Sequence, residues 1–211
     1  MTTYTVEELH DQLKTIIANE ENGDCKVRYD LPSVPFFKVQ PGFFSGNGVH
    51  FNFNSNNRFS LKDKSKGVLY LALTPQTALK ESFQEEETID LQDLKIYCMA
   101  ELQATRNLKI FDVRALALLL KIPVGDLMGP KEPVYPHTQQ LAQLLAQYAD
   151  GMLYLSRHTG KECIVLWSDS VNGGGCLNTK SVISLNEYSH NGKSAKQILK
   201  SELNIGVTNL S

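Results

Sequence analysis

Four residues in two separated segments of the chain have side chains that suit the binding and cleavage of an anionic nucleotide. Arg58 precedes an apolar run, Tyr70 lies inside that run, Glu81 falls on the segment that follows, and Ser156 ends a later apolar run. A guanidinium can bond two phosphate oxygens at once. A fixed carboxylate can stabilise positive charge that develops on a sugar. Their types and order predict one pocket that grips an anionic nucleotide.

Each of these residues, taken singly, also fits an ordinary structural role. A tyrosine in an apolar strand is often a core residue with a satisfied hydroxyl. Arginine at a loop–strand junction and glutamate on a short helix are more often exposed. The trio Ser156-Arg157-His158 fits a solvated turn as well as it fits a ligand contact. The combination therefore carries the prediction, and no single position does.

The run from Gly67 to Thr74 should place Tyr70 in a buried strand. It is apolar almost throughout and rich in β-branched and aromatic residues, as a central strand is. Alternation puts Val68, Tyr70 and Ala72 on one face and Leu69, Leu71 and Leu73 on the other. Because the two neighbours of Tyr70 on its face are smaller, we expect open space beside the ring.

The helix that follows this strand should carry Glu81. Thr74 can accept a hydrogen bond from a free N–H of the first turn, and Pro75 suits the first helical position. Glu81 lies about two turns into the helix, between Leu79 and Phe83. That position faces the predicted sheet, so we expect the carboxylate to point towards the pocket.

The remaining elements follow from the same patterns. A capping box at Thr5 predicts an amphipathic helix over residues 6–19. Residues 25–60 should form short strands joined by irregular loops, and the four prolines in residues 123–136 predict a loop. The other expected strands are 94–102, 108–113, 152–155, 163–167 and 182–185, and the other expected helices are 114–121, 137–148 and 194–203.

These elements predict an α+β fold, because strands and helices mix without regular alternation. We expect an N-terminal helix in residues 1–24 and one compact catalytic unit in residues 25–211. The sheets should be mixed or antiparallel, with flanking helices. A chain of 211 residues fits a single domain.

Composition narrows the functional classes. A net charge of −2 gives no basic surplus for a nucleic-acid footprint. The four cysteines lack paired or zinc-like spacing, and the five histidines show no metal-ligand spacing, so no metal is expected. No cleavable signal sequence and no apolar run of about 18 residues is visible, which predicts a cytoplasmic protein without a membrane partner. Export without a cleavable signal stays open.

At this point the chain resembles the RES-domain family, which is named for its arginine, glutamate and serine. Three blocks carry the resemblance: Asn57-Arg58-Phe59, then Val68 to Pro75 with Ala78 to Glu81, then Gln140-Leu141-Ala142 with Asp150 to Arg157. Asn57 stands where the family usually has glycine. Arg28-Tyr29 is similar to an early arginine-containing block of the family.

The resemblance implies a fold related to the ADP-ribosyltransferase toxins and an enzyme that consumes NAD⁺ as its substrate. The implied reaction cleaves the nicotinamide–ribose bond, with water or phosphate as acceptor. Two alternatives stay open: transfer of ADP-ribose to a protein by the same pocket, and an inactive module that only binds NAD⁺. Many members are toxins held inactive by a partner, so a neutralising antitoxin or immunity protein is implied here as well.

The resemblance also implies roles for individual residues. Arg58 would hold the pyrophosphate or a phosphate acceptor, and Glu81 would contact the ribose hydroxyls and stabilise the charge that forms as nicotinamide leaves. Ser156 would help to position the nicotinamide ribose.

Four further residues would bind the nucleotide by the same resemblance. Arg28 and Tyr29 would contact it through the early block. Tyr70 would stack against its nicotinamide side, and Arg157 would lie close to Ser156.

Overall fold

The computed structural model describes residues 5–128 and 131–209. Its strands are β1 Arg28–Leu31, β2 Pro35–Pro41, β3 Gly67–Ala72, β4 Thr88–Asp90, β5 Tyr97–Ala104, β6 Leu108–Asp112, β7 Gly151–Leu155, β8 Glu162–Ser168, β9 Leu177–Ser184, β10 Ser189–His190, β11 Lys193–Ser194 and β12 Gly206–Thr208. Its α-helices are α1 Val6–Glu21, α2 Pro75–Ser82, α3 Leu91–Ile96, α4 Val113–Leu119, α5 Val124–Met128, α6 Lys131–Leu145 and α7 Ala195–Glu202. Two 3₁₀ turns complete them, η1 Phe44–Gly46 and η2 Gly173–Gly175.

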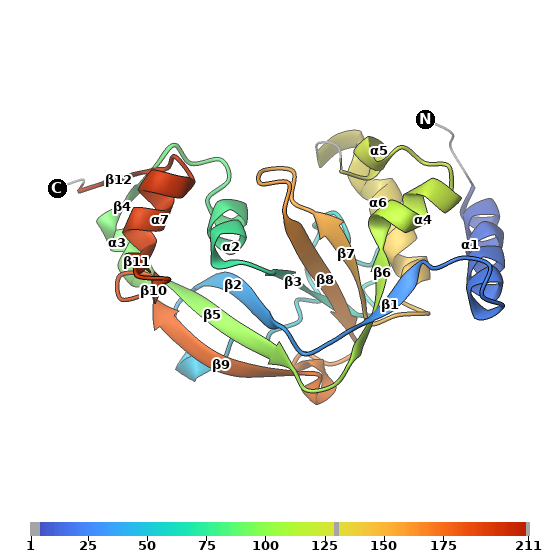
Figure 1. The fold of residues 1–211 in the computed structure, drawn as a ribbon, viewed down its shortest axis with the longest axis horizontal. Coiled ribbons are helices and arrows are strands. Elements are labelled where there is room, and N and C mark those ends of the chain that lie inside the picture. The colour runs from blue at the N-terminus through green and yellow to red at the C-terminus, as the bar shows by residue number, and fades with distance from the viewer. Residues whose placement is uncertain (1–4, 129–130, 210–211) are drawn as a thin grey trace.

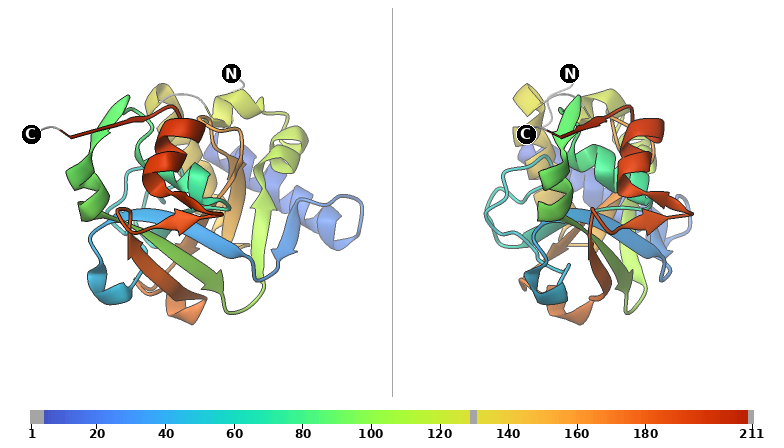
Figure 2. Two further views of the ribbon diagram at one scale, coloured as in Figure 1. Left: turned by 60° about the vertical axis from the view of Figure 1, so that its left-hand side comes forward. Right: turned by 90° about the vertical axis from the view of Figure 1, so that its left-hand side faces the viewer.

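The main sheet has eight strands in the order β1-β6-β7-β8-β3-β2-β5-β9. Only β6 and β7 pair in parallel within it, and all its other pairs are antiparallel. Figure 1 shows α2 and α7 above β2 and β5, and α4, α5 and α6 beside β6 on the other side of the molecule. In both views of Figure 2 the helices gather on the upper side of the sheet. The predicted α+β class is confirmed, with a curled mixed sheet and flanking helices.

The sheet divides between β2 and β3. Strand β2 pairs with β5 along its whole length, and β3 pairs with β8 along its whole length. The two strands pair with each other only at Phe37 and Ala72. Beyond that pair they diverge, and Asn52 forms a bridge with Val68 at the far end of β3. A sheet that opens in this way leaves room for a ligand between its two parts.

The core lies on both faces of β3, as the alternation predicts. Val68, Ala72 and the ring of Tyr70 pack into the cluster beneath the helices. Leu69 and Leu71 pack into a second cluster on the opposite face. No helix in the described part of the chain is long and apolar enough to cross a membrane.

Three expected elements differ from the structure. Strand β5 begins at Tyr97 rather than residue 94, because the capping box at Asp90 starts helix α3 there. Most of the expected loop 123–136 is helical: α5 covers Val124–Met128, and residues 131–136 belong to α6 although two prolines lie among them. Pro136 has no N–H to donate to the carbonyl four residues earlier, and the helix nevertheless continues through it. Strand β9 begins at Leu177 rather than residue 182; its first half is polar because it is an edge strand.

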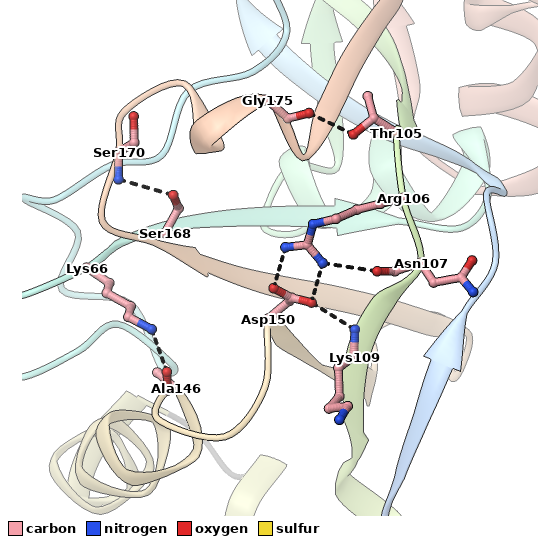
Figure 3. Close-up of polar contacts among 10 residues, drawn as sticks. All are labelled: Lys66, Thr105, Arg106, Asn107, Lys109, Ala146, Asp150, Ser168, Ser170 and Gly175. Atoms are coloured by element: carbon pink, nitrogen blue, oxygen red, sulfur yellow. Dashed lines mark hydrogen bonds and ion pairs between the residues drawn. The ribbon is translucent and has the colours of Figure 1, made fainter.

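Asp150 fastens the start of β7 to the start of β6 (Figure 3). Its Oδ1 and Oδ2 accept hydrogen bonds from the Arg106 guanidinium at 2.7 and 2.9 Å, and Oδ2 also accepts from the Lys109 N–H at 2.8 Å. Burial raises the pKa of Asp150, but the bonds from Arg106 and Lys109 outweigh it and leave the pKa below its usual value. Gly151 follows because an added Cβ would collide with the Val165 carbonyl of β8. The Asp150-Gly151 pair is therefore structural.

We expect Asp150→Ala to lower the free energy of unfolding by about 1–3 kcal/mol at pH 7, because the Lys109 N–H loses a charged acceptor. The half-exposed ion pair with Arg106 adds little. The pKa of Asp150 is lower in the folded protein than in the unfolded chain, where it is about 3.9. The ionised carboxylate therefore stabilises the folded protein fully above that pH, and this stabilisation is lost as the pH falls through the folded-state pKa. Urea unfolding across pH should therefore show the variant and the wild type converging in acid. The exposed Asp169→Ala is the matched control, and an equal loss there would contradict the assignment.

Candidate functional site

A cavity of about 480 Å³ lies where β2 and β3 separate. Residues 68–72 of β3 and 37–39 of β2 line it, together with the loop that bears Arg58 and the end of α2 that bears Glu81. Tyr70, Tyr154 and Arg157 line it as well. Segments far apart in the sequence thus meet around a single space.

The loop that carries Arg58 is not part of a β-sheet at that residue. Its main chain is held instead by hydrogen bonds with side chains from three other elements. The Thr138 hydroxyl of α6 donates to the Arg58 carbonyl at 2.7 Å. The Trp167 indole of β8 donates to the Phe59 carbonyl at 2.9 Å, and the Phe59 N–H donates to the Tyr70 hydroxyl at 3.0 Å. These bonds satisfy buried main-chain groups and fix the position of the arginine.

The Arg58 guanidinium is buried, and no carboxylate of a described side chain forms an ion pair with it. The residue is 8% exposed, donates to the Leu127 carbonyl at 2.8 Å and lies over the Tyr135 ring at 5.4 Å. Burial lowers its pKa, Tyr135 opposes that shift, and the charge of Arg157 lowers the pKa further. A desolvated cation beside a second cation is costly unless an anion joins them. The pair is therefore suited to a bound anionic group.

Glu81 and Ser156 are in direct contact although 75 positions separate them. The Ser156 hydroxyl donates to Oε1 of Glu81 at 2.5 Å. Helix α2 begins as predicted, with the Thr74 hydroxyl accepting from the Thr77 N–H at 3.2 Å and Pro75 at its first position. Glu81 is half-buried in the last turn and lines the cavity, as expected from its place on the helix.

Tyr70 presents its ring to the cavity between Val68 and Ala72, which line it too. Its ring lies edge-on to that of Tyr154, with centroids 6.4 Å apart. Burial raises the pKa of Tyr70. The hydrogen bond from the Phe59 N–H lowers that pKa, but by less. Tyr70 is therefore a neutral phenol at physiological pH and can offer its ring face and edge to a ligand.

Arg157 forms part of the exposed rim of the cavity, on the turn between β7 and β8. The Arg157 side chain is exposed, lines the cavity, and its Nε donates to Nε2 of His158 at 3.1 Å. Burial lowers the pKa of His158. The charge of Glu81 raises this pKa, and the charge of Arg157 lowers it further.

Lys38 lines the cavity and was not expected to. It lies half-buried in the middle of β2, and burial lowers its pKa to about 8. A single lysine within the apolar run Pro35-Phe36-Phe37-Lys38-Val39 is the signal that could have identified it. None of the ion pairs between described side chains involves Lys38, Arg58 or Arg157.

Arg28 and Tyr29 lie elsewhere, on the outer strand β1 of the sheet. The Arg28 Nε donates to Oε2 of Glu20 at 2.5 Å, and its guanidinium lies over the Phe111 ring at 5.8 Å. Neither Arg28 nor Tyr29 lines the cavity. Burial, with nearby acidic side chains, raises the pKa of Tyr29 to about 12. The arrangement does not support the expectation that these two residues bind the nucleotide, because β1 is placed by pairing with β6 and Arg28 is neutralised by Glu20.

Comparison with known proteins places the chain in a family. The RES domain profile matches residues 44–177. The chain belongs to the RES-domain family, as the three sequence blocks predicted. A chain in the crystal structure of the M. tuberculosis MbcT–MbcA toxin–antitoxin complex superposes with a TM-score of 0.60 at 12% identity, covering 85% of this chain and 93% of that one. This likeness shows that the two chains share a fold. No curated protein sequence matches the chain.

The site holds no group of three or more His, Cys, Asp or Glu side chains arranged for a metal ion, and neither does the rest of the described chain. Its charged lining is mainly cationic, with Lys38, Arg58 and Arg157 against the carboxylate of Glu81. An anion bound by the cations and a positive centre facing the carboxylate would fit this distribution.

The lowered pKa of Lys38 makes the affinity of the cavity for anions depend on pH. Lysine is charged below its pKa and neutral above it, so a pKa of about 8 means that the charge is lost as pH rises through 8. We expect the dissociation constant for sulfate, whose own charge does not change, to rise by about 10-fold between pH 7 and pH 9.5. Chemical-shift titration by NMR would measure it.

Two variants of Lys38 provide the control. Lys38→Arg keeps its charge throughout this range and should make the affinity independent of pH, whereas Lys38→Met should bind weakly at every pH. A Lys38→Arg protein with the same pH dependence as the wild type would show that another group is responsible.

Proposed function

We propose that this protein is a toxin-type enzyme that cleaves the nicotinamide–ribose bond of NAD⁺, as a glycohydrolase or a phosphorylase. One observation carries the proposal: a carboxylate held by a hydrogen bond shares a cavity with three cations that have no acidic partner among the described residues. NAD⁺ combines an anionic pyrophosphate with a ribose that becomes positively charged as the bond breaks. The cavity offers the opposite charge to each.

The pyrophosphate would lie among Arg58, Arg157 and Lys38. Arg58 is the strongest candidate contact, because a guanidinium can bond two phosphate oxygens and this one is already largely desolvated. Its other bonds go to a main-chain carbonyl and a ring face, neither of which neutralises it. Binding an anion would reduce the repulsion between Arg58 and Arg157, so the cavity is preorganised for a negatively charged ligand.

Glu81 would act on the ribose. Loss of nicotinamide leaves an oxocarbenium-like sugar, and a carboxylate fixed beside it stabilises that charge more in the transition state than in the ground state. Nicotinamide leaves as a neutral base from a cationic ring, so its departure requires no proton. The rings of Tyr70 and Tyr154 would border the nicotinamide side of the ligand and limit the access of water.

We also propose that a protein partner neutralises this activity. The basis is the likeness in fold to a chain from a toxin–antitoxin complex, together with membership of the RES-domain family. Protein ADP-ribosylation by the same pocket is the second candidate function. The exposed rim at Arg157 favours it, because an acceptor protein would have to approach the ribose from that open side.

We expect the purified protein to release nicotinamide from NAD⁺. Glu81→Ala should lower kcat by about 10²–10³-fold, because the charge on the ribose loses its stabilising group. Arg58→Ala should mainly raise KM, since it removes binding to the pyrophosphate in the ground and transition states alike. Chromatographic time courses of NAD⁺ loss would measure both. Glu85→Ala, which removes an exposed carboxylate just beyond α2, should retain wild-type turnover. Wild-type turnover in both site variants would refute the assignment.

The products should identify the acceptor. With NAD⁺ labelled in its adenylate moiety, label in free ADP-ribose means that water is the acceptor, and label in its phosphate ester, formed only with phosphate present, means phosphorolysis. Label on a protein band from an added lysate would instead support protein ADP-ribosylation. Tight binding of NAD⁺ without any product, with or without phosphate, would leave only a binding module.

A further inference from the structure

The hydroxyl of Ser156 has all of its hydrogen-bonding capacity in use. Its oxygen donates to Oε1 of Glu81 at 2.5 Å and accepts from the main-chain N–H groups of His158 at 3.2 Å and Thr159 at 3.1 Å. A serine hydroxyl offers one donor and two acceptor lone pairs. No further bond is left for a ligand.

Burial leads to the same conclusion. Ser156 is 2% exposed and is absent from the cavity lining, whereas Glu81 and Arg157 both line it. The serine therefore stands behind the site rather than in it. Its bond uses one acceptor site on Oε1 of Glu81 and leaves Oε2 free of the serine.

Ser156 also organises the turn between β7 and β8. Its N–H donates to the Lys161 carbonyl and its carbonyl accepts from the Gly160 N–H, both at 2.8 Å. Gly160 adopts a positive φ of 65°, which lets the turn close. Arg157 is the next residue in this turn. Ser156 thus links the turn that carries Arg157 to helix α2, which carries Glu81.

We propose that Ser156 is a positioning residue that fixes the Glu81 carboxylate, and with it the turn bearing Arg157, in place of a direct contact with the ribose. The proposal rests on the proposed function. Glutamate has three side-chain torsions, and Glu81 lies in the last turn of a short helix. A carboxylate that must be ordered during each turnover stabilises the transition state less than one already in place. The two main-chain N–H groups also polarise the hydroxyl and strengthen the bond that it donates.

A double-mutant cycle tests this role. Ser156→Ala should lower kcat for NAD⁺ cleavage by about 10²-fold, with KM changed by less than about threefold. In a Glu81→Ala background the same substitution should have no further effect, because the group that it positions is gone. Ser156→Thr keeps a hydroxyl and should recover most of the turnover. Ser201→Ala, at an exposed serine of α7, is the control for a general effect and should match the wild type.

Two kinetic outcomes would overturn the proposal. A raised KM with unchanged kcat in Ser156→Ala would mean that the serine contacts the ligand. Losses that multiply in the double variant would mean that it acts independently of Glu81. If Ser156→Ala does not fold, Ser156→Cys, which retains a side chain of similar shape but donates weakly, would enter the same cycle.

Crystal structures separate this proposal from the proposed function. The Glu81 carboxylate should leave its position in Ser156→Ala and keep it in Ser156→Thr. If the wild type does not consume NAD⁺, the proposed function fails, and the position of Glu81 in the Ser156→Ala crystal still decides the role of Ser156. A carboxylate that stays in place there would refute the positioning role.

Discussion

The site depends on one constraint, the pairing of β2 with β3 at a single position. Had these strands paired along their length, the sheet would be continuous and its interior filled by side chains. Their separation instead leaves strand edges inside the protein, and main-chain groups there must be satisfied by something other than a ladder. The loop that includes Asn52 and Arg58 takes that place. The loop is irregular because it bridges diverging strands. Its main-chain groups are nevertheless satisfied, because side chains of α6, β3 and β8 form hydrogen bonds with them.

Charge is distributed differently inside and outside the cavity. Away from it, arginines are neutralised at short range: Arg28 by Glu20, and Arg106 by Asp150. At the cavity, Arg58 is buried beside a ring and a carbonyl, and the charge of Arg157 lowers its pKa. The carboxylate of Glu81 is directed to a serine hydroxyl rather than to a cation. Charges that are not paired with each other around one cavity support the ligand proposed above, which carries both signs.

The sequence predicts those features of the structure that depend on neighbouring residues, and it does not predict those that depend on which strands pair. The strand at Gly67–Ala72 and the helix start at Thr74 follow from alternation and capping, and both are confirmed. The family blocks add Arg58 to the same neighbourhood. The cavity itself is not local, because it arises from which strands pair. The place of Lys38 in the cavity lining could not be predicted, because it depends on the divergence of β2 from β3. The place of Arg28 outside the lining could not be predicted either, because it depends on the ion pair with Glu20 of the preceding helix.

The working unit extends beyond the segment that matches the family profile. That segment, residues 44–177, contains Glu81 and Arg58 but not β2, which supplies one wall of the cavity and Lys38. Nor does it contain α7, which contacts α2 and whose buried residues Ile198 and Leu199 belong to the same core cluster as Ala78 and Leu79 of α2. The helix that presents the carboxylate is therefore held between the sheet and a C-terminal helix. A carboxylate stabilises a transition state best when its support is rigid. In the proposed reaction the flanking segments would therefore contribute through α2, although they carry none of the three residues after which the family is named.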